Sequence, residues 1–172
     1  MVGGHWCGNL ANQEKSQGYE TNEVGLTQTV NRRTISTDLH YQETKPGPLF
    51  RDWIVGVLSG YDWNWDGDRV GTYVGNVINV RFHNFWSLNT YSQHSFSSYD
   101  DQLTRGGPLV RLPARNNLNA TLTSDGRGLL AVQVNGSLNW NPAGGWSRDV
   151  GVTATIHPGP TFQPPVGPSY SR

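Results

Sequence analysis

Residues 51–82 constrain the fold most, because their side chains alternate along two long arms joined by a tight turn. In the first arm, one face would carry Trp53, Val55, Val57, Ser59, Tyr61, Trp63 and Trp65. The opposite face would carry Ile54, Gly56, Leu58, Gly60, Asp62 and Asn64. A period of two indicates a β-strand, and Asp66-Gly67 predicts the turn because glycine accepts a positive φ. We therefore expect one long β-hairpin.

The second arm alternates in the same way. One face would carry Thr72, Val74, Asn76, Ile78, Val80 and Phe82, and the other Gly71, Tyr73, Gly75, Val77, Asn79 and Arg81. Each arm is roughly a dozen residues long, whereas strands of soluble proteins usually contain about 5–6 residues. A strand that crosses an outer membrane needs ~9–11 tilted residues, with aromatic rings where it leaves the lipid. The arm length predicts an all-β, antiparallel up-and-down meander that forms part or all of a transmembrane β-barrel.

The chain of 172 residues is polar without being strongly charged. Its 13 basic and 13 acidic side chains cancel, so no attraction to nucleic acid is expected. Charged residues make up 15% of the chain, below the ~25% of ordinary domains, and Asn, Ser, Thr, Gly and aromatic residues replace them. This composition suits a barrel wall around a wet, uncharged lumen. It suits a soluble glycan-binding β-sandwich equally well.

We expect neither a spanning helix nor a secretory signal within this sequence. No run of 18 or more apolar residues occurs, and the first twenty residues lack the basic and apolar regions of a signal peptide. An outer-membrane protein with this sequence is therefore expected to be part of a longer chain. Cys7 is the single cysteine, which excludes an intrachain disulfide and a thiolate zinc cluster and predicts an inert thiol.

The remaining residues predict further strands and no helix. Strands are expected at 23–29, 34–43, 86–99, 117–123, 129–140 and 147–156, with a loop at 100–108. Short connections predict one barrel-type domain of about eight strands at residues 19–157. Residues 1–18 show no sustained period and are expected to be irregular, and residues 158–172 are expected to form a proline-rich tail without regular strands.

Seven short motifs follow one another along the chain. They lie at 19–26 (YETNEVGL), 31–33 (NRR), 63–69 (WNWDGDR), 82–86 (FHNFW), 100–108 (DDQLTRGGP), 144–147 (GGWS) and 167–172 (GPSYSR). In this order they resemble the C-terminal β-barrel region of the DUF5916 family, whose members are bacterial envelope proteins. The resemblance spans residues 19–172. In that family the region commonly follows a family 9-like carbohydrate-binding domain.

The resemblance implies a segment of an outer-membrane barrel with more strands than the eight expected from the pattern. It also implies a signal peptide upstream and further strands downstream, so the chain resembles a fragment whose flanking strands are missing. The family has no assigned biochemical role, and its link to carbohydrate comes from the neighbouring domain. The resemblance therefore implies no catalytic residues.

One group of oxygen-bearing side chains resembles a loose calcium loop. Asp62, Asp66 and Asp68 lie close to Asn64 in sequence, and hard cations bind several oxygen ligands. The distal bidentate glutamate of an EF-hand is missing, and the turn alone explains Asp66. The five histidines are scattered over different segments, which argues against zinc. We expect no metal site and no cofactor.

Three residues are the candidates for ligand binding. Asp101 and Arg105 lie in the predicted loop at 100–108, where an arginine–carboxylate pair would position the loop. Trp146 lies in a glycine-rich segment, where its indole ring would stack on a sugar. Asp100 and Asp101 would point apart on an extended chain, whereas a glycosidase needs two carboxyl groups ~5–9.5 Å apart. A purely structural loop is the alternative interpretation.

Five further tryptophans, Trp53, Trp63, Trp65, Trp86 and Trp140, lie near the ends of predicted strands. Amphipathic rings favour the membrane–water interface, so we expect interface aromatics, with sugar stacking as the alternative. The sequence thus predicts a non-catalytic outer-membrane segment, structural or passively pore-forming, that contacts lipid and is linked to glycan capture or uptake. The alternatives are a soluble carbohydrate-binding β-sandwich and, third, a hydrolase fragment.

Overall fold

The computed structural model describes residues 5–16, 31–101, 103–104, 107–156, 165–166 and 169–171, and these residues form strands and turns without a helix. The strands are β1 (Trp6–Lys15), β2 (Arg32–Glu43), β3 (Phe50–Trp63), β4 (Arg69–Phe82), β5 (Ser87–Ser95), β6 (Ser98–Asp100), β7 (Val110–Leu112), β8 (Arg115–Thr123), β9 (Leu130–Trp140), β10 (Trp146–Ile156), β11 (Pro165–Val166) and β12 (Ser169–Ser171). In the described part of the chain, no helix is long and apolar enough to cross a membrane.

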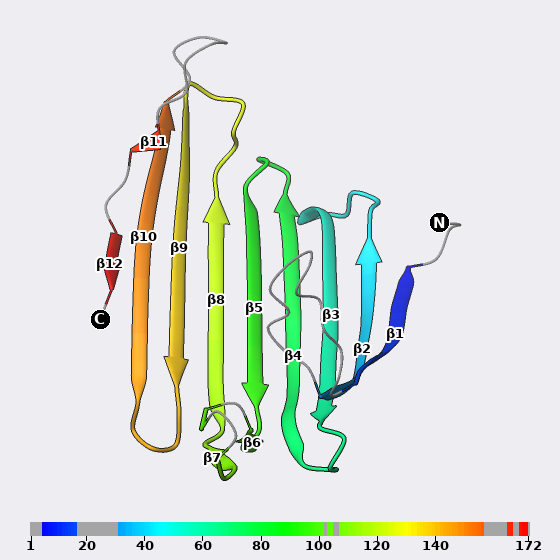
Figure 1. Ribbon diagram of the computed structural model, residues 1–172. Coiled ribbons are helices and arrows are strands. Elements are labelled where there is room, and N and C mark those ends of the chain that lie inside the picture. Colours follow the sequence, from blue (N-terminus) through cyan, green and yellow to red (C-terminus); the bar gives the residue numbers. More distant parts are fainter. Residues whose placement is uncertain are drawn as a thin grey trace, which may run out of the picture.

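One antiparallel sheet contains ten of the strands in the order β1-β2-β3-β4-β5-β8-β9-β10-β11, with β12 also paired to β10. The long strands stand side by side, with β1 at one edge and β10 to β12 at the other (Figure 1). The short strands β6 and β7 form a separate hairpin between β5 and β8. The predicted all-β antiparallel meander is therefore confirmed. Between the described strands, no pairing joins the two edges into a closed barrel.

Three segments differ from the sequence predictions. Residues 6–15 form β1, which pairs with β2 along its whole length although Gly8, Asn9 and Ala11 are poor strand formers. The hydrogen-bonded pairing with β2 therefore determines that residues 6–15 form a strand. The side-chain pattern of these residues does not predict it. The proline-rich tail contains β11 and β12, where Pro165 pairs with Thr155 in an edge strand that tolerates its missing N–H. The long strand expected at 86–99 is divided into β5 and β6, and the strand expected at 23–29 lies outside the described residues.

The β3–β4 hairpin matches its predicted turn. Gly67 has a φ of 91°, as expected for a glycine in a tight turn. Asn64 closes this turn, because its side-chain oxygen accepts the Asp68 amide at 2.7 Å and its side-chain nitrogen donates to the Asp68 carboxylate at 3.0 Å. We call the end of the sheet with this turn the lower end and the opposite one the upper end, as they appear in Figure 1.

The register separates the sheet into two faces, since directly opposed residues of an antiparallel pair project to the same side. The apolar face carries Trp6, Leu10, Ile35, Leu39, Tyr41, Trp53, Val55, Val57, Tyr61, Trp63, Val74, Ile78, Val80, Leu88, Leu118, Leu122, Val132, Val134, Leu138, Trp140, Trp146, Val150, Val152 and Ile156. The polar face carries Arg32, Thr34, Ser36, Asp38, His40, Asp62, Tyr73, Asn79, Asn89, Tyr91, Gln93, Ser95, Arg115, Asn117, Asn119, Thr121, Gln133, Asn135, Ser137, Asn139, Ser147, Asp149 and Thr153. The alternation predicted for the central hairpin is confirmed.

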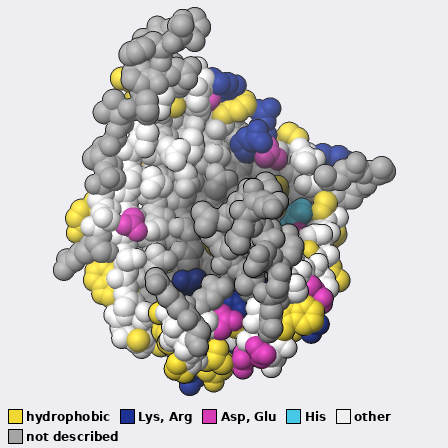
Figure 2. Space-filling model, viewed as in Figure 1, with side chains coloured by type: hydrophobic (Ala, Val, Ile, Leu, Met, Phe, Trp, Pro, Cys, Tyr) yellow, Lys and Arg dark blue, Asp and Glu magenta, His cyan; other side chains and the backbone are white. Residues whose placement is uncertain are grey.

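The sheet has no hydrophobic core among the described residues. Among these residues the polar side chain of Asn64 is buried, with 2% exposure, and no apolar side chain is buried. Instead the apolar face is open: Val57 is 56% exposed, Val150 50% and Leu39 49%. In Figure 2 the side turned to the viewer is mainly white between the grey residues, and yellow side chains gather at its borders. Antiparallel sheets commonly pack one apolar face against a core, and the described residues form no such core over this face.

The polar face holds a close contact between a glycine and an aromatic ring. Gly60 lies opposite Tyr73, and a Cβ atom added to Gly60 would lie 2.6 Å from Cζ of that ring. We expect Gly60→Ala to displace the ring and to lower the free energy of unfolding by about 1–3 kcal/mol. In the control Gly126→Ala, a Cβ meets nothing within 4 Å, and the change should be below about 1 kcal/mol. Denaturant titration measures both, and equal effects would contradict the contact.

Candidate functional site

Aromatic rings form a band at the upper end of the apolar face. The Trp6 ring on β1 contacts the Tyr41 ring on β2, and the Tyr41 ring contacts the Trp53 ring on β3. The ring centroids of Trp6 and Tyr41 are 5.2 Å apart, as are those of Tyr41 and Trp53. We call these three residues the upper aromatic band. It lies where Trp53 was expected, at the end of a strand.

A second group of rings forms a band at the lower end of the same face. Tyr61 and Trp63 on β3 have ring centroids 5.3 Å apart, and Trp140 and Trp146 lie directly opposite each other on β9 and β10. We call these four residues the lower aromatic band. Trp146 begins β10 and is 54% exposed on the apolar face, so it belongs with the strand-end tryptophans. Its role in sugar binding stays a prediction.

Trp65 and Trp86 lie in turns at opposite ends of the sheet. The Trp65 indole N–H donates to the Lys15 carbonyl at 2.9 Å, and the Arg33 guanidinium lies 3.7 Å from the Trp65 ring centroid. The Trp86 carbonyl accepts the Phe82 amide at 2.8 Å in the β4–β5 turn. Both tryptophans are therefore near strand ends, as the sequence predicted. Whether they lie at an interface stays a prediction.

An arginine–carboxylate pair fastens the loop after β6 to the polar face. Arg32 donates two hydrogen bonds to Asp101, at 2.7 and 2.6 Å, and each side chain is 16% exposed. The hydrogen bonds from Arg32 hold the pKa of Asp101 below its ordinary value, although desolvation opposes them. We call this pair the clamp. It joins β2 to a segment that follows it by 69 residues.

Other bonds gather three of the sequence motifs at this lower end. Asn31 has a φ of 59°, a left-handed conformation that asparagine tolerates, and its side-chain oxygen accepts the Trp65 amide at 3.0 Å. Arg69 donates to the Ser97 carbonyl at 2.8 Å. With the clamp, these bonds connect motifs 31–33, 63–69 and 100–108. The structure thus gives the three motifs one shared place in the fold.

The predicted ligand-binding residues do not gather into one site. Asp101 lies at the lower end of the polar face, whereas Trp146 lies on the apolar face. Arg105 is outside the described residues, so its pairing with Asp101 stays a prediction. Among the described residues, Asp101 pairs with Arg32. Sequence reasoning missed Arg32, because nothing in its spacing points to Asp101. Its place in the NRR motif, at the start of β2, was the available signal.

The carboxylates of the loose calcium pattern have separate partners. Asp62 projects on the polar face and accepts the Thr34 hydroxyl at 2.5 Å. Asp68 remains in the turn with Asn64. In the described ranges, no group of three or more His, Cys, Asp or Glu residues is arranged to hold a metal ion.

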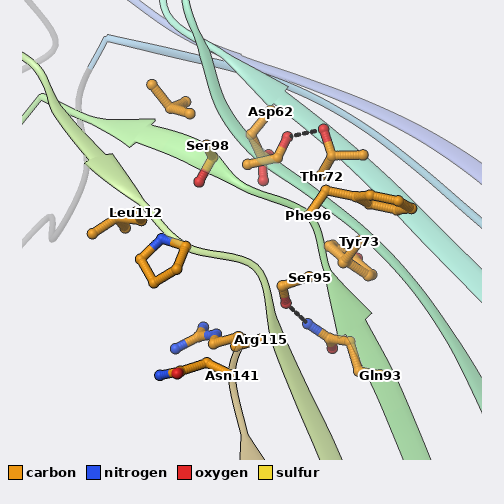
Figure 3. Close-up of a pocket in the computed structure, with 13 residues that line it drawn as sticks. Asp62, Thr72, Tyr73, Gln93, Ser95, Phe96, Ser98, Leu112, Arg115 and Asn141 are labelled. Atoms are coloured by element: carbon orange, nitrogen blue, oxygen red, sulfur yellow. Dashed lines mark hydrogen bonds between the residues drawn. The ribbon is translucent and has the colours of Figure 1, made fainter. Parts of the chain in front are cut away.

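A cavity of about 420 Å³ lies between the polar face and the β6–β7 hairpin. Its wall on the sheet is made by Tyr73 of β4 with Gln93 and Ser95 of β5. Ser98, Leu112 and Pro113 line it from the hairpin, and Asp62, Arg115 and Asn141 line its remaining sides. Figure 3 shows Arg115 beside Asn141, with Ser95 between them and Asp62 and with Gln93 to one side. This cavity and the clamp both lie at the lower end, and together they are the candidate functional site.

Beyond Arg115, amide side chains continue along the polar face. Asn119 donates to Asn117 at 2.6 Å, Asn117 donates to Asn139 at 2.6 Å, and Asn139 donates to Ser147 at 3.2 Å. These side chains connect β8, β9 and β10. The chain of bonds makes a wall of uncharged donors and acceptors, which can exchange hydrogen bonds with neutral polar solutes.

Comparison with known proteins gives one family. The model of the family described as "Domain of unknown function (DUF5916)" matches residues 1–157. It therefore includes the N-terminal strand β1 and ends before the motif at 167–172. No match was found among curated proteins or among solved structures.

Proposed function

The chain belongs to the DUF5916 family, and from that premise we propose that it forms part of the wall of a bacterial outer-membrane β-barrel. Its role is non-catalytic: it is a structural segment or one side of a passive pore. One observation carries this proposal, namely the exposed apolar side chains on one face of the sheet while the described residues form no core. Acyl chains would cover such a face in a membrane barrel, whose wall is apolar outside and polar inside.

The spacing of the two aromatic bands supports lipid as this occupant. Trp53 and Trp63 lie ten residues apart on β3, which is about 33 Å along a strand at ~3.3 Å per residue. A strand tilted by about 40° would span ~25 Å along the barrel axis, which is the height of the apolar belt in outer-membrane barrels. The bands would then lie at the two interfaces, where tryptophan and tyrosine are enriched.

The polar face supports the passive part of the proposal. In a barrel it would line the lumen, where the amides of Asn117, Asn119 and Asn139 offer hydrogen bonds without net charge. A neutral, hydroxylated solute would exchange bonds with water for bonds with this wall. Such a lining agrees with the carbohydrate-binding domain that the family resemblance implies upstream, and we propose glycan capture or uptake as the context.

A soluble β-sandwich has less support. A sandwich would need a second sheet over the apolar face. The described second sheet, β6–β7, instead lines the cavity together with polar-face residues such as Gln93 and Ser95. It therefore lies on the wrong side to bury Val57 or Val150.

Folding in two solvents tests the proposal. We expect cooperative β-structure by circular dichroism in detergent micelles and no cooperative folding in plain buffer. A gel band that shifts on heating would indicate a closed barrel. The edge at β1 would then pair with the edge at β12, either directly or through further strands. Cooperative folding in buffer without detergent would contradict the membrane proposal and would favour the sandwich.

A further inference from the structure

Arg115 stands out among the arginines of the polar face. It is the first residue of β8, lies opposite Ser95 and is exposed. Arg32 and Arg81 each pair with a carboxylate, whereas Arg115 has no ion pair or hydrogen bond within the described ranges. Arg115 is one of the residues that line the 420 Å³ cavity. A planar guanidinium is the group best suited to bind a carboxylate through two parallel hydrogen bonds.

The neighbouring side chains have hydrogen-bonding capacity left for a ligand. The Gln93 carbonyl accepts the Tyr91 hydroxyl, and its amide donates to the Ser95 hydroxyl at 2.9 Å. One amide hydrogen of Gln93 and the hydroxyl hydrogen of Ser95 remain as donors in the described structure. The side-chain oxygen of Asn141 accepts the Gly145 amide at 2.9 Å, which leaves its amide nitrogen as a further donor. The side near Arg115 is therefore rich in donors.

The opposite side of the cavity supplies an acceptor. Asp62 contributes a carboxylate that accepts the Thr34 hydroxyl through one oxygen, and the second oxygen can accept a ligand hydroxyl. Leu112 and Pro113 add apolar surface from the hairpin, suited to the C–H groups of a ring. The volume of about 420 Å³ lies within the ~300–1,000 Å³ of small-molecule sites. A fitting ligand has a carboxylate at one end and hydroxyl groups at the other.

We propose that this cavity binds a hydroxylated carboxylate of the size of a sugar acid. Its carboxylate pairs with Arg115, and a hydroxyl group at its far end donates to Asp62. The inference rests on the proposed function in one respect, because the ligand reaches the cavity along the polar face that would line the lumen. It goes further by naming the ligand class and the residue that selects it.

Calorimetric titration of the protein folded in micelles tests the ligand class. The probes are D-glucuronate and D-glucose, which differ in one carboxylate. We expect saturable glucuronate binding and glucose affinity lower by about 10- to 100-fold, the effect of losing hydrogen bonds to a charged group. Equal affinity for the two sugars, or no saturable heat with glucuronate, would overturn the proposal.

Two variants of Arg115 test its role. Arg115→Gln should lower glucuronate affinity by about 10- to 100-fold, and Arg115→Lys should lose less because it keeps the charge but not the planar fork. The matched control is Arg81→Gln, which removes an arginine from the upper end of the same face. Loss of affinity in Arg81→Gln equal to that in Arg115→Gln would indicate unspecific charge attraction and overturn the site. Should Arg115→Gln fail to fold, affinity of Arg115→Lys equal to that of the unaltered protein would also overturn it.

The outcomes separate this inference from the membrane proposal. Folding in micelles without glucuronate binding would overturn the cavity site and leave the barrel wall standing. Folding in plain buffer with Arg115-dependent binding would support the cavity site and contradict the barrel wall.

Discussion

Val57→Arg should lower the stability of the protein folded in micelles by about 2–4 kcal/mol, the cost of an arginine at the lipid-facing midplane of a barrel. Val57 lies in the middle of β3 on the apolar face, between the two aromatic bands, and is 56% exposed. In water, the same substitution at an exposed site would change stability by less than about 0.5 kcal/mol. The size of the effect therefore reports the medium that contacts this face. It is measured as the free energy of unfolding, together with the folded fraction on a gel.

Thr121→Arg is the matched control for this experiment. Thr121, the third residue from the upper end of β8, lies on the polar face, opposite Asn89 and Asn135. Its replacement would project a charge into the lumen, where water solvates it, so we expect a change below about 1 kcal/mol. Similar losses in the two variants would mean that the faces have similar surroundings. That result would contradict lipid contact at the apolar face.

Breaking the clamp should release the hairpin from the polar face. Arg32→Ala leaves the Asp101 carboxylate, 16% exposed in the intact pair, without its two charged donors. We expect a loss of about 1.5–3 kcal/mol in the local stability of residues 96–114, typical of hydrogen bonds to a charged group. The change would appear as faster proteolysis or hydrogen exchange in this segment, with the long strands unaffected. Arg127→Ala is the control, because it breaks a local and more exposed arginine–carboxylate pair, with Asp125, in the β8–β9 loop.

The same clamp should respond to acid. Because Arg32 lowers the pKa of Asp101 in the folded state, folding favours the ionised carboxylate. The stabilisation is complete above the unfolded pKa of about 3.9 and is lost as the pH falls through the lower folded value. Protection of residues 96–114 should therefore decline from about pH 4 downward in the unaltered protein. Arg32→Ala should lack this decline. If protection falls equally in the unaltered protein and in Arg32→Ala, the decline must come from another titrating group.

The local pattern of the sequence predicts most of the strands and their faces. In β3 and β4 the alternation of side chains is a property of neighbouring residues, so a period of two and the Asp66-Gly67 turn were sufficient. The same holds for β9 and β10, where Val132, Val134, Val150 and Val152 mark one face. The pattern failed at β1, where Gly8 and Asn9 carry little strand signal and the pairing with β2 decides.

Sequence alone determined that the chain is all-β and two-faced, since both follow from contacts between near neighbours. Only the tertiary structure decided which distant residues meet. The clamp joins Arg32 to Asp101, and the cavity brings Arg115 together with Asp62 and Gln93. The proximity of these residues depends on the register of several successive strands and on the side of the sheet to which the β6–β7 hairpin folds. A shift of one residue in any register would move a whole strand to the opposite face, and no local pattern records that choice.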